Sequence, residues 1–285
     1  MGETVRRTIG RGDAFQLVSA HGPLCARPEP DTVRGDTFCQ PVAAEDLTGT
    51  VVTSSAPVAV FAGHDCALVP YNRFACDHLE EQLVPDEGLG LRYVAPRTPH
   101  LADEPEVLRV VATRPGTRLV FEPAAAHAPV TLAAAGDFVE FEHRASVAVT
   151  ASAPVVAAQF LVGAGYDAST LLNVRGDPDM VILPPVEQAR GRYRFVAAPG
   201  FPDSVAIATA PAGERLRLDG AEVTAAPVGS VAGFAVYHLR VAPGAHALEA
   251  VRRGVRFGLL VSGLAPSTSY TYPGGLDLAP IAPPP

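Results

Sequence analysis

The stretch TSSAPVAVF, residues 53–61, indicates the fold of the chain. Its threonine and serines form a polar turn, and Pro57 fixes its own φ angle and keeps the residue before it extended. The alternating valines and alanines that follow are typical of a strand that enters a β sheet. We therefore interpret this stretch as a strand-entry element and not as a ligand site.

The same element returns further along the chain. TASAPVVAA begins at Thr150, so Pro57 corresponds to Pro154, with a shift of 97 residues (154 − 57). Arg118 and Arg215 show the same shift (215 − 118), and two further pairs of strand-like stretches follow in the same order. Four ordered matches predict two copies of one β unit, with a repeat of about 97 residues.

Short apolar stretches bounded by turn residues recur along the whole chain, and its 28 prolines and 26 glycines interrupt every helical pattern. Turns at intervals of about eight to twelve residues are typical of antiparallel sandwiches. The sequence thus predicts an all-β fold of tandem antiparallel β-sandwich units, with few or no long helices. We place an N-terminal segment that packs on the first unit at residues 1–45, a first β sandwich at 46–135, a second with closing strands at 136–278, and a proline-rich linker at 279–285.

The charge balance argues against two classes of partner. The formal net charge is −8, and all 22 basic residues are arginines, which indicates a GC-rich, bacterial genome more than a function. Nucleic acids and anionic membranes both select clustered positive charge, so neither is expected as a partner. No apolar run approaches the roughly 18 residues of a membrane span, and the first residues lack the apolar core of a signal peptide. We expect a cytosolic protein, or a mature or excised part of a longer exported one.

The stretch GHDCALVPYNRFACDHLEEQ, residues 63–82, carries the strongest candidates for chemistry. His64, Cys66, Cys76 and His78 supply the two nitrogens and two sulfurs of a zinc site, but the Cys-x-His pairs are too tight to chelate comfortably. A nucleophile pair of Cys76 and His78 is the catalytic alternative, and its spacing gives it poor geometry. No hydrolase, metalloprotease or nucleotide-binding signature occurs, so the sequence predicts no enzyme and no cofactor.

The four cysteines form two local pairs, Cys25 with Cys39 and Cys66 with Cys76. Four cysteines permit three connectivities, and the local pairs favour two small disulfide loops. Loops of about 11 to 15 residues would each stabilise the fold by roughly 3 kcal/mol. Disulfides imply an oxidising compartment.

Polar residues near the second cysteine pair and in two similar turns are further candidates. EQLVPDE at residues 81–87 and LPPVEQ at 183–188 occupy equivalent places in the two repeats, where their side chains could hydrogen-bond across the repeat interface or line a ligand groove. The aspartates could instead hold calcium, which requires six or more oxygens, although their spacing matches no calcium loop. The candidate binding or interface residues are His64, Asp65, Asp77, His78, Glu81, Gln82, Asp177, Asp179, Glu187 and Gln188, and none is assigned to a metal.

Longer stretches resemble a known family. GHDCALVPYNRFACDHLEEQLVP, residues 63–85, is similar to the GHxCAxVPxxxxxCDHLxEQLxP signature of the N-terminal domain family of the IgG Fc-binding protein, and the chain resembles a bacterial member. The similarity covers about residues 40–278, and it includes DLTGTVVTSSAPVAVF, GDPDMVILPPVEQ, LDG and SYTYPGG. The chain departs from the family where DEGLGLRY replaces a tryptophan and a glycine that often follow the EQLPP segment.

The resemblance implies an extracellular, disulfide-containing and non-catalytic β domain of adhesive type, in which Cys66 pairs with Cys76. We expect a protein or glycan ligand at a cell surface or in a matrix, and neighbouring domains in a larger chain. A structural spacer or assembly module is the first alternative, and an enzyme of unrecognised type is the second.

Overall fold

The structure of the chain is a computed structural model that describes residues 3–19, 25, 27–31, 33–42, 45–99, 103–166 and 175–281. Within these ranges the regular elements are β strands and two short 3-10 helices, so the predicted all-β antiparallel class is confirmed. No helix in the described part of the chain is long and apolar enough to cross a membrane.

Most strands belong to one of two β sandwiches. The first contains β5 (Arg92–Ala95), β6 (Glu106–Ala112), β7 (Thr117–Glu122), β8 (Val130–Leu132), β9 (Phe138–His143), β10 (Val147–Ala151), β11 (Val155–Leu161) and β12 (Asp179–Ile182). The second contains β13 (Arg192–Ala197), β14 (Asp203–Pro211), β15 (Leu216–Leu218), β16 (Ala221–Glu222), β17 (Gly229–Val231), β18 (Phe234–Arg240), β19 (Gly244–Ala250), β20 (Gly258–Ala265) and β21 (Thr268–Pro273). The remaining elements are β1 (Pro28–Pro30), β2 (Thr37–Cys39), β3 (Phe61–Leu68), β4 (Cys76–Gln82), and the 3-10 helices η1 (Asp86–Gly88) and η2 (Val186–Gln188).

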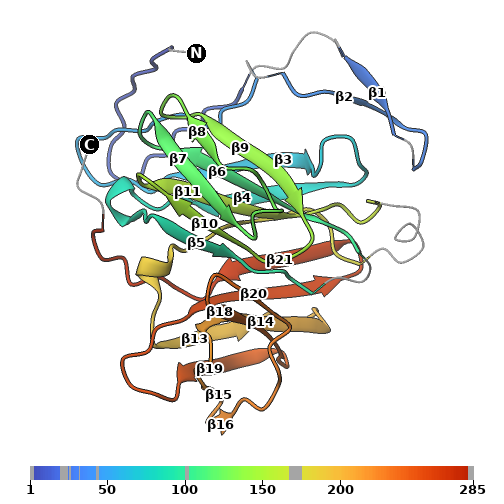
Figure 1. The fold of residues 1–285 in the computed structure, drawn as a ribbon. Helices are drawn as coiled ribbons and strands as arrows, with labels where there is room; N and C mark the ends of the chain where they lie inside the picture. Colours follow the sequence, from blue (N-terminus) through green and yellow to red (C-terminus); the bar gives the residue numbers. More distant parts are fainter. Residues whose placement is uncertain are drawn as a thin grey trace.

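Each sandwich is built from two antiparallel sheets. The first sandwich, green in Figure 1, has sheets of strand order β5-β10-β7-β8 and β12-β11-β6-β9. The second, orange to red, has sheets of order β13-β19-β15-β16 and β17-β18-β14-β20-β21. Outside these sheets, within the described ranges, β1 pairs with β2 alone and β3 with β4 alone.

Strand pairing crosses the boundary that the sequence placed at residue 135. β6 pairs with β9 and β11, and β7 pairs with β10, so strands on both sides of this residue belong to one sandwich. The predicted division into 46–135 and 136–278 is therefore wrong at this point. A sequence repeat gives the distance between equivalent residues but not the residue at which each unit begins. Pairing between strands that lie far apart in the chain also leaves no recognisable pattern in the sequence of either strand.

One hydrophobic core cluster joins both sandwiches. Val205 and Ile207 of β14 belong to the same buried cluster as Tyr93 and Val149 of the first sandwich. The intervening side chains of β14 face the core of the second sandwich, so every residue from 204 to 210 is buried. Figure 1 shows the resulting arrangement, with the second sandwich stacked under the first.

Two equivalent tyrosines close the start of each sandwich. Tyr93 accepts a hydrogen bond from the Gly90 N–H (3.0 Å) and donates to the Val155 carbonyl (2.6 Å). Tyr193 accepts from the Arg190 N–H (2.8 Å) and donates to the Phe257 carbonyl (2.6 Å). These tyrosines are 100 residues apart (193 − 93), a spacing close to the predicted repeat but not equal to it. The repeat of 97 residues therefore stays a prediction.

Replacing Tyr193 by phenylalanine is expected to lower the free energy of unfolding by roughly 2 kcal/mol, because it leaves the Arg190 N–H and the Phe257 carbonyl without their partner in a buried place. Urea unfolding followed by circular dichroism measures the change. Tyr237→Phe is the control, since the Tyr237 hydroxyl makes no hydrogen bond within the described residues. Equal midpoints for the two variants would contradict the role given to the Tyr193 hydroxyl.

The stretch at residues 53–61 forms less strand than its sequence predicts. Residues 51–60 carry no strand, and β3 begins only at Phe61. The equivalent stretch in the first sandwich continues from β10 into β11, where Val155 pairs with Ala112 of β6. A strand requires a paired neighbour, and none of the described strands pairs with residues 51–60.

The two predicted end segments make specific contacts. In the N-terminal segment, Glu29 accepts hydrogen bonds from Tyr71 and Asn72, in the loop between β3 and β4. In the predicted linker, the Ile281 N–H donates to the Glu87 carbonyl (2.6 Å), and residues 282–285 lie outside the described residues. The linker therefore begins against η1 and not as a free spacer.

Candidate functional site

The predicted chemistry at residues 63–82 is that of a disulfide-bonded hairpin. Cys66 and Cys76 form a disulfide between β3 and β4, with Cα atoms 5.0 Å apart, and Cys25 and Cys39 form a second, with Cα atoms 5.3 Å apart. Both local pairs are confirmed, and no described cysteine is free. The zinc site and the Cys–His nucleophile both required a thiolate, so neither interpretation is supported.

Three of the candidate residues lie on the exposed surface of this hairpin. His64 Nδ1 lies 3.0 Å from the backbone nitrogen of Cys66 and 3.3 Å from the carboxylate of Asp65. His78 Nε2 lies 3.6 Å from Glu80. Both histidine side chains are 62% exposed, and their described partners are residues of the same hairpin. They make no enclosed site.

The four acidic candidates Asp77, Glu81, Asp177 and Asp179 form a group that we call the carboxylate junction, because β4 lies beside β12 there and β12 lies beside β21. The pKa of Asp179 is raised to about 7 and that of Asp177 to about 6, chiefly by burial and to a smaller extent by the nearby charge of Asp77. Burial raises the pKa of Glu81 to about 7, with Asp179 as the second cause. One carboxylate oxygen each of Asp177 and Asp179 is buried and has no hydrogen-bond partner within the described residues.

Calcium has no support at this junction. No group of three or more histidine, cysteine, aspartate or glutamate side chains in the described ranges is arranged to hold a metal ion. Asp65 also lies apart from the junction, on the exposed side of the hairpin, with its side chain 97% exposed. The buried carboxyl groups therefore relieve their mutual repulsion by binding protons.

The two turns that contain Glu–Gln pairs lie at the contact between repeats. Gln188 is fully buried, and its Nε2 donates to the carbonyls of Gly88 in η1 (3.0 Å) and Ala279 (2.8 Å). Glu187 accepts a hydrogen bond from Arg92 of the first sandwich (3.2 Å). Gln82 is exposed at the end of β4, opposite Phe61. Gln188 and Glu187 thus bridge the sandwiches, whereas Gln82 lies at the hairpin edge.

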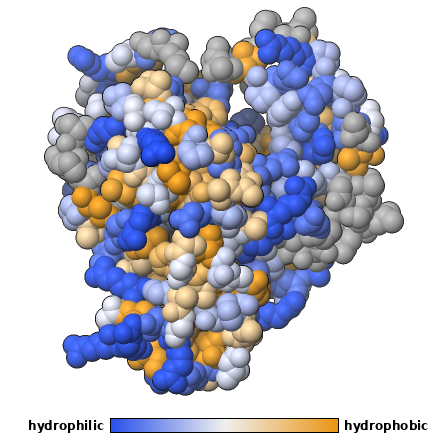
Figure 2. All heavy atoms as spheres, viewed as in Figure 1, coloured by the Kyte–Doolittle hydropathy of each residue, from blue (hydrophilic) through white to orange (hydrophobic). Residues whose placement is uncertain are grey.

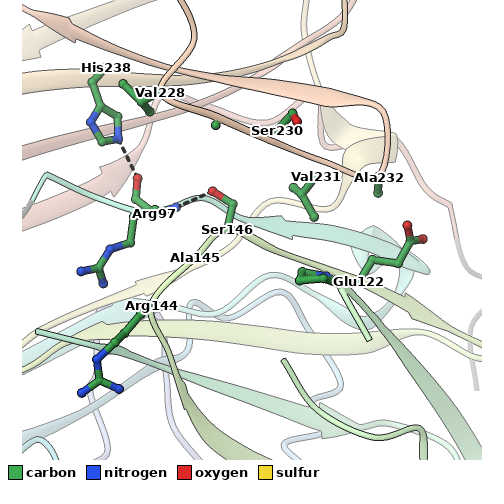
Figure 3. A pocket seen from close by; sticks show the side chains of 12 residues that line it. Arg97, Glu122, Arg144, Ala145, Ser146, Val228, Ser230, Val231, Ala232 and His238 are labelled. Carbon is green, nitrogen blue, oxygen red and sulfur yellow. Dashed lines mark hydrogen bonds between the residues drawn. The ribbon is translucent and has the colours of Figure 1, made fainter. Parts of the chain in front are cut away.

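The structure also contains a cleft that the sequence did not predict. It lies between the two sandwiches and has a volume of about 480 Å³. Its lining includes Arg97, Arg144, Ser146, Ser230 and His238, among other residues. In Figure 3 the side chains of Arg97 and Arg144 lie on one side of the cleft, and Glu122 lies on the other. One wall is β17, which lies at the edge of its sheet and, among the described strands, pairs with β18 alone.

Hydrogen bonds hold Arg97 in place in this cleft. Its guanidinium group donates to the fully buried Glu106 (3.1 Å), and its backbone N–H donates to Ser146 Oγ (2.9 Å). His238 Nε2 of the second sandwich donates to the Arg97 carbonyl (2.7 Å). The lining residues come from separate segments, and no local spacing pattern in the sequence connects them. Arg97 follows a proline in the sequence, and nothing in this local pattern indicates that it lines a cleft.

Removing the hairpin disulfide by the double substitution Cys66→Ser and Cys76→Ser is expected to lower the free energy of unfolding by about 2 kcal/mol. Because Cys66 and Cys76 are only 10 positions apart, the disulfide closes a short loop, and the β3–β4 ladder still holds part of the hairpin together without it. Urea unfolding of oxidised protein measures the effect. The matched change of Cys25 and Cys39 shows whether the effect belongs to this hairpin, and an unchanged midpoint would remove the disulfide from the account of stability.

Comparison of the sequence with known proteins shows the family of this chain. A family model described as IgGFc binding protein matches residues 1–263. The chain belongs to the IgGFc-binding protein family. The human protein named IgGFc-binding protein is 33% identical over 251 residues, which cover 84% of this chain and 4% of that protein. The chain thus spans a small fraction of the length of this relative.

One solved structure gives only a distant likeness. An anti-sigma factor domain-containing protein is 12% identical, with 64% of this chain and 82% of that chain covered. The TM-score is 0.18, so this likeness carries no argument about fold or function. Membership of the IgGFc-binding family therefore rests on the sequence, and the bacterial origin stays a prediction.

Proposed function

We propose that this member of the IgGFc-binding family is a non-catalytic extracellular binding module, and that its ligand is a protein or glycan at a cell surface or in a matrix. The cleft between the sandwiches is the observation that carries this proposal. Its volume of about 480 Å³ lies within the roughly 300–1,000 Å³ typical of ligand sites, and it combines the small side chains of β17 with a few oriented polar groups. Two disulfides support an extracellular location.

The placement of the reactive groups supports a non-catalytic role. The carboxyl groups with raised pKa values, Glu81, Asp177 and Asp179, lie at the strand junction and do not line the cleft. Arg97 and His238, which do line it, are hydrogen-bonded to structural partners. A catalytic site would bring such perturbed groups together in the cleft.

The human relative is named for IgG Fc, so the Fc fragment of human IgG is the first ligand to test, followed by a glycan array. The oxidised chain is immobilised, and the binding of dissolved Fc to it is measured. Ser230→Trp fills the cleft from its strand wall, and Ala221→Trp places the same side chain on exposed β16 as the control. We expect saturable binding by the wild type and the control, and at least a tenfold loss for Ser230→Trp.

A structural spacer is the second candidate. The shared core between the sandwiches favours it, because it gives a rigid body with a fixed angle between its units. On the face shown in Figure 2, apolar residues are interspersed with polar ones, which suits a solvent-exposed spacer as well as a binding module. Binding of neither Fc nor any glycan would favour the spacer over the binding module.

A further inference from the structure

Three hairpins in the chain share one geometry. In the first sandwich, the Leu183 N–H donates to the Ala157 carbonyl (2.8 Å) beside the β11–β12 pair. In the second, the Gly274 N–H donates to the Leu259 carbonyl (2.8 Å) beside the β20–β21 pair. At β3–β4, the Leu83 N–H donates to the Val60 carbonyl (2.9 Å). The β3–β4 hairpin therefore corresponds to β11–β12 and to β20–β21.

The β3–β4 hairpin differs from the other two because one edge of β3 is open. β11 pairs with β12 on one side and with β6 on the other, and β20 lies in the same way between β21 and β14. In the part of the chain that the structure describes, β3 pairs with β4 alone. The residues of β3 from 61 to 66 are exposed, and the exposed side chains of Val58 and Phe61 lie at or beside this edge. Among the described residues, no strand fills beside β3 the position that β6 and β14 fill elsewhere.

The backbone of β3 is oriented to accept a strand in this position. Because Leu83 bonds to Val60, residues 60 and 62 direct their backbone groups toward β4. Phe61 and Gly63 then present their N–H and C=O groups to the open edge. The equivalent of Phe61 in the first sandwich is Ala158, which pairs with Arg109 of β6.

The charge of the hairpin indicates which strand would fit. Asp65 and Glu80 are exposed, Asp77 is half-buried, and the strands β3 and β4 contain no arginine. Arg73, in the loop that joins them, pairs with Asp31. A basic strand would complement this charge. β6, which fills the equivalent position beside β11, itself combines β-branched side chains with an arginine.

We propose that the open edge of β3 is a docking site for an extended, basic β strand of a partner polypeptide, which adds antiparallel to β3 as β6 adds to β11 and β14 adds to β20. Strand addition to an exposed edge is an established mode of peptide recognition, in which ladder hydrogen bonds supply affinity. An open edge is otherwise a liability for aggregation. This inference goes beyond the proposed function, because it uses a different face of the chain from the cleft.

The test uses a labelled synthetic peptide with the sequence of residues 107–114, VLRVVATR, and the oxidised full chain. Fluorescence anisotropy is expected to show saturable binding that weakens as NaCl is raised from about 50 to 500 mM. The same peptide with proline in place of Val111 should bind at least tenfold more weakly, because proline cannot donate to the ladder. No binding of the parent peptide, or equal binding of the proline peptide, would overturn the proposal.

Substitutions in β3 test the edge from the other side. Phe61→Pro removes one N–H of the open edge and should weaken peptide binding at least tenfold, whereas Phe61→Ala keeps this N–H and should weaken it less. The unfolding midpoints of both variants show whether the hairpin is intact, and the proline peptide decides the question if Phe61→Pro does not fold. A dimer of the chain alone that Phe61→Pro dissociates, without peptide binding, would assign the edge to a second copy and overturn the partner strand.

Discussion

Replacing Glu106 by alanine is expected to lower the free energy of unfolding by about 3–5 kcal/mol. Glu106 is fully buried, and its carboxylate accepts hydrogen bonds from the Thr98 N–H (2.6 Å), the Arg97 guanidinium group (3.1 Å) and Gln159 Nε2 (3.2 Å). The substitution leaves the Arg97 charge, whose side chain is only 18% exposed, without its main partner. Breaking one side of a buried ion pair costs more than the pair contributes, because the other charge stays desolvated.

Urea unfolding at neutral pH measures this effect. Glu249→Ala is the matched control, since Glu249 pairs with Arg192 and Arg217 on the surface, and removing an exposed pair costs about 0–1 kcal/mol. Glu106→Gln keeps the shape of the side chain and should fall between the two. Similar losses for Glu106→Ala and Glu249→Ala would show that the buried network contributes no more than a surface ion pair.

Glu106→Ala should also disturb the cleft. Arg97 lines the cleft, and its carbonyl accepts the hydrogen bond from His238 that ties the second sandwich to the first. Loss of Glu106 frees the Arg97 side chain, so the contact between sandwiches should loosen before the sheets unfold. Hydrogen exchange at β5 and β18 would detect this as faster exchange near these strands than in the core of either sandwich.

Raising the pH from about 4 to about 8 is expected to lower the free energy of unfolding by several kcal/mol, because of the carboxylate junction. The fully buried Asp179 alone would contribute about 4 kcal/mol at roughly 1.4 kcal/mol per pKa unit, and Asp177 and Glu81 add less than their full shifts because solvent screens them. Folding raises the pKa values of Asp177 to about 6 and of Asp179 and Glu81 to about 7, chiefly through burial. Between the unfolded and folded pKa values the folded state binds more protons than the unfolded state. The stabilisation is therefore complete below about pH 4 and is lost as the pH rises through 6 to 7.

Asp179→Asn should flatten this pH dependence, because the amide is neutral throughout and cannot repel Asp77. Asp65→Asn, on the exposed side of the same hairpin, is the control and should leave the pH profile of the wild type unchanged. Urea midpoints at pH 4.5, 6 and 7.5 give the profile. The urea midpoint of the wild type should fall from pH 4.5 to 7.5. A midpoint that rises over this range would contradict the raised pKa values given to the carboxylate junction.

The strand pattern and the disulfides were predictable because their signals are local. The Ser-Ala-Pro turn and the valines and alanines after it predicted a strand in the stretch that begins at Thr150, where the structure has β11, and the spacing of Cys66 and Cys76 favoured the disulfide that the structure contains. The same pattern at residues 58–61 predicted a strand that begins only at Phe61. The two stretches share the Ser-Ala-Pro turn and the valine after it, and they differ in their neighbouring strands, which only the fold supplies.

The candidate site was only partly predictable for the same reason. Asp177 and Asp179 were selected from the sequence, but their contact with Asp77 and Glu81 depends on β4 lying beside β12. Glu106 and Gln159 lie 53 residues apart and meet only because β6 pairs with β11. The residues of the cleft were missed altogether, since Arg97, Ser146 and Ser230 come from segments with no shared pattern.

The sequence by itself was enough to predict an antiparallel β protein of the IgGFc-binding family and to favour two local disulfides, because short apolar stretches, the signature at residues 63–85 and the cysteine spacing are all local signals. Only the tertiary structure decided where one sandwich ends and how the two stack. β14 is buried on both faces, so its apolar side chains give no alternation from which the second contact could be recognised. That contact places the two sandwiches against each other, and the cleft between them exists because of it.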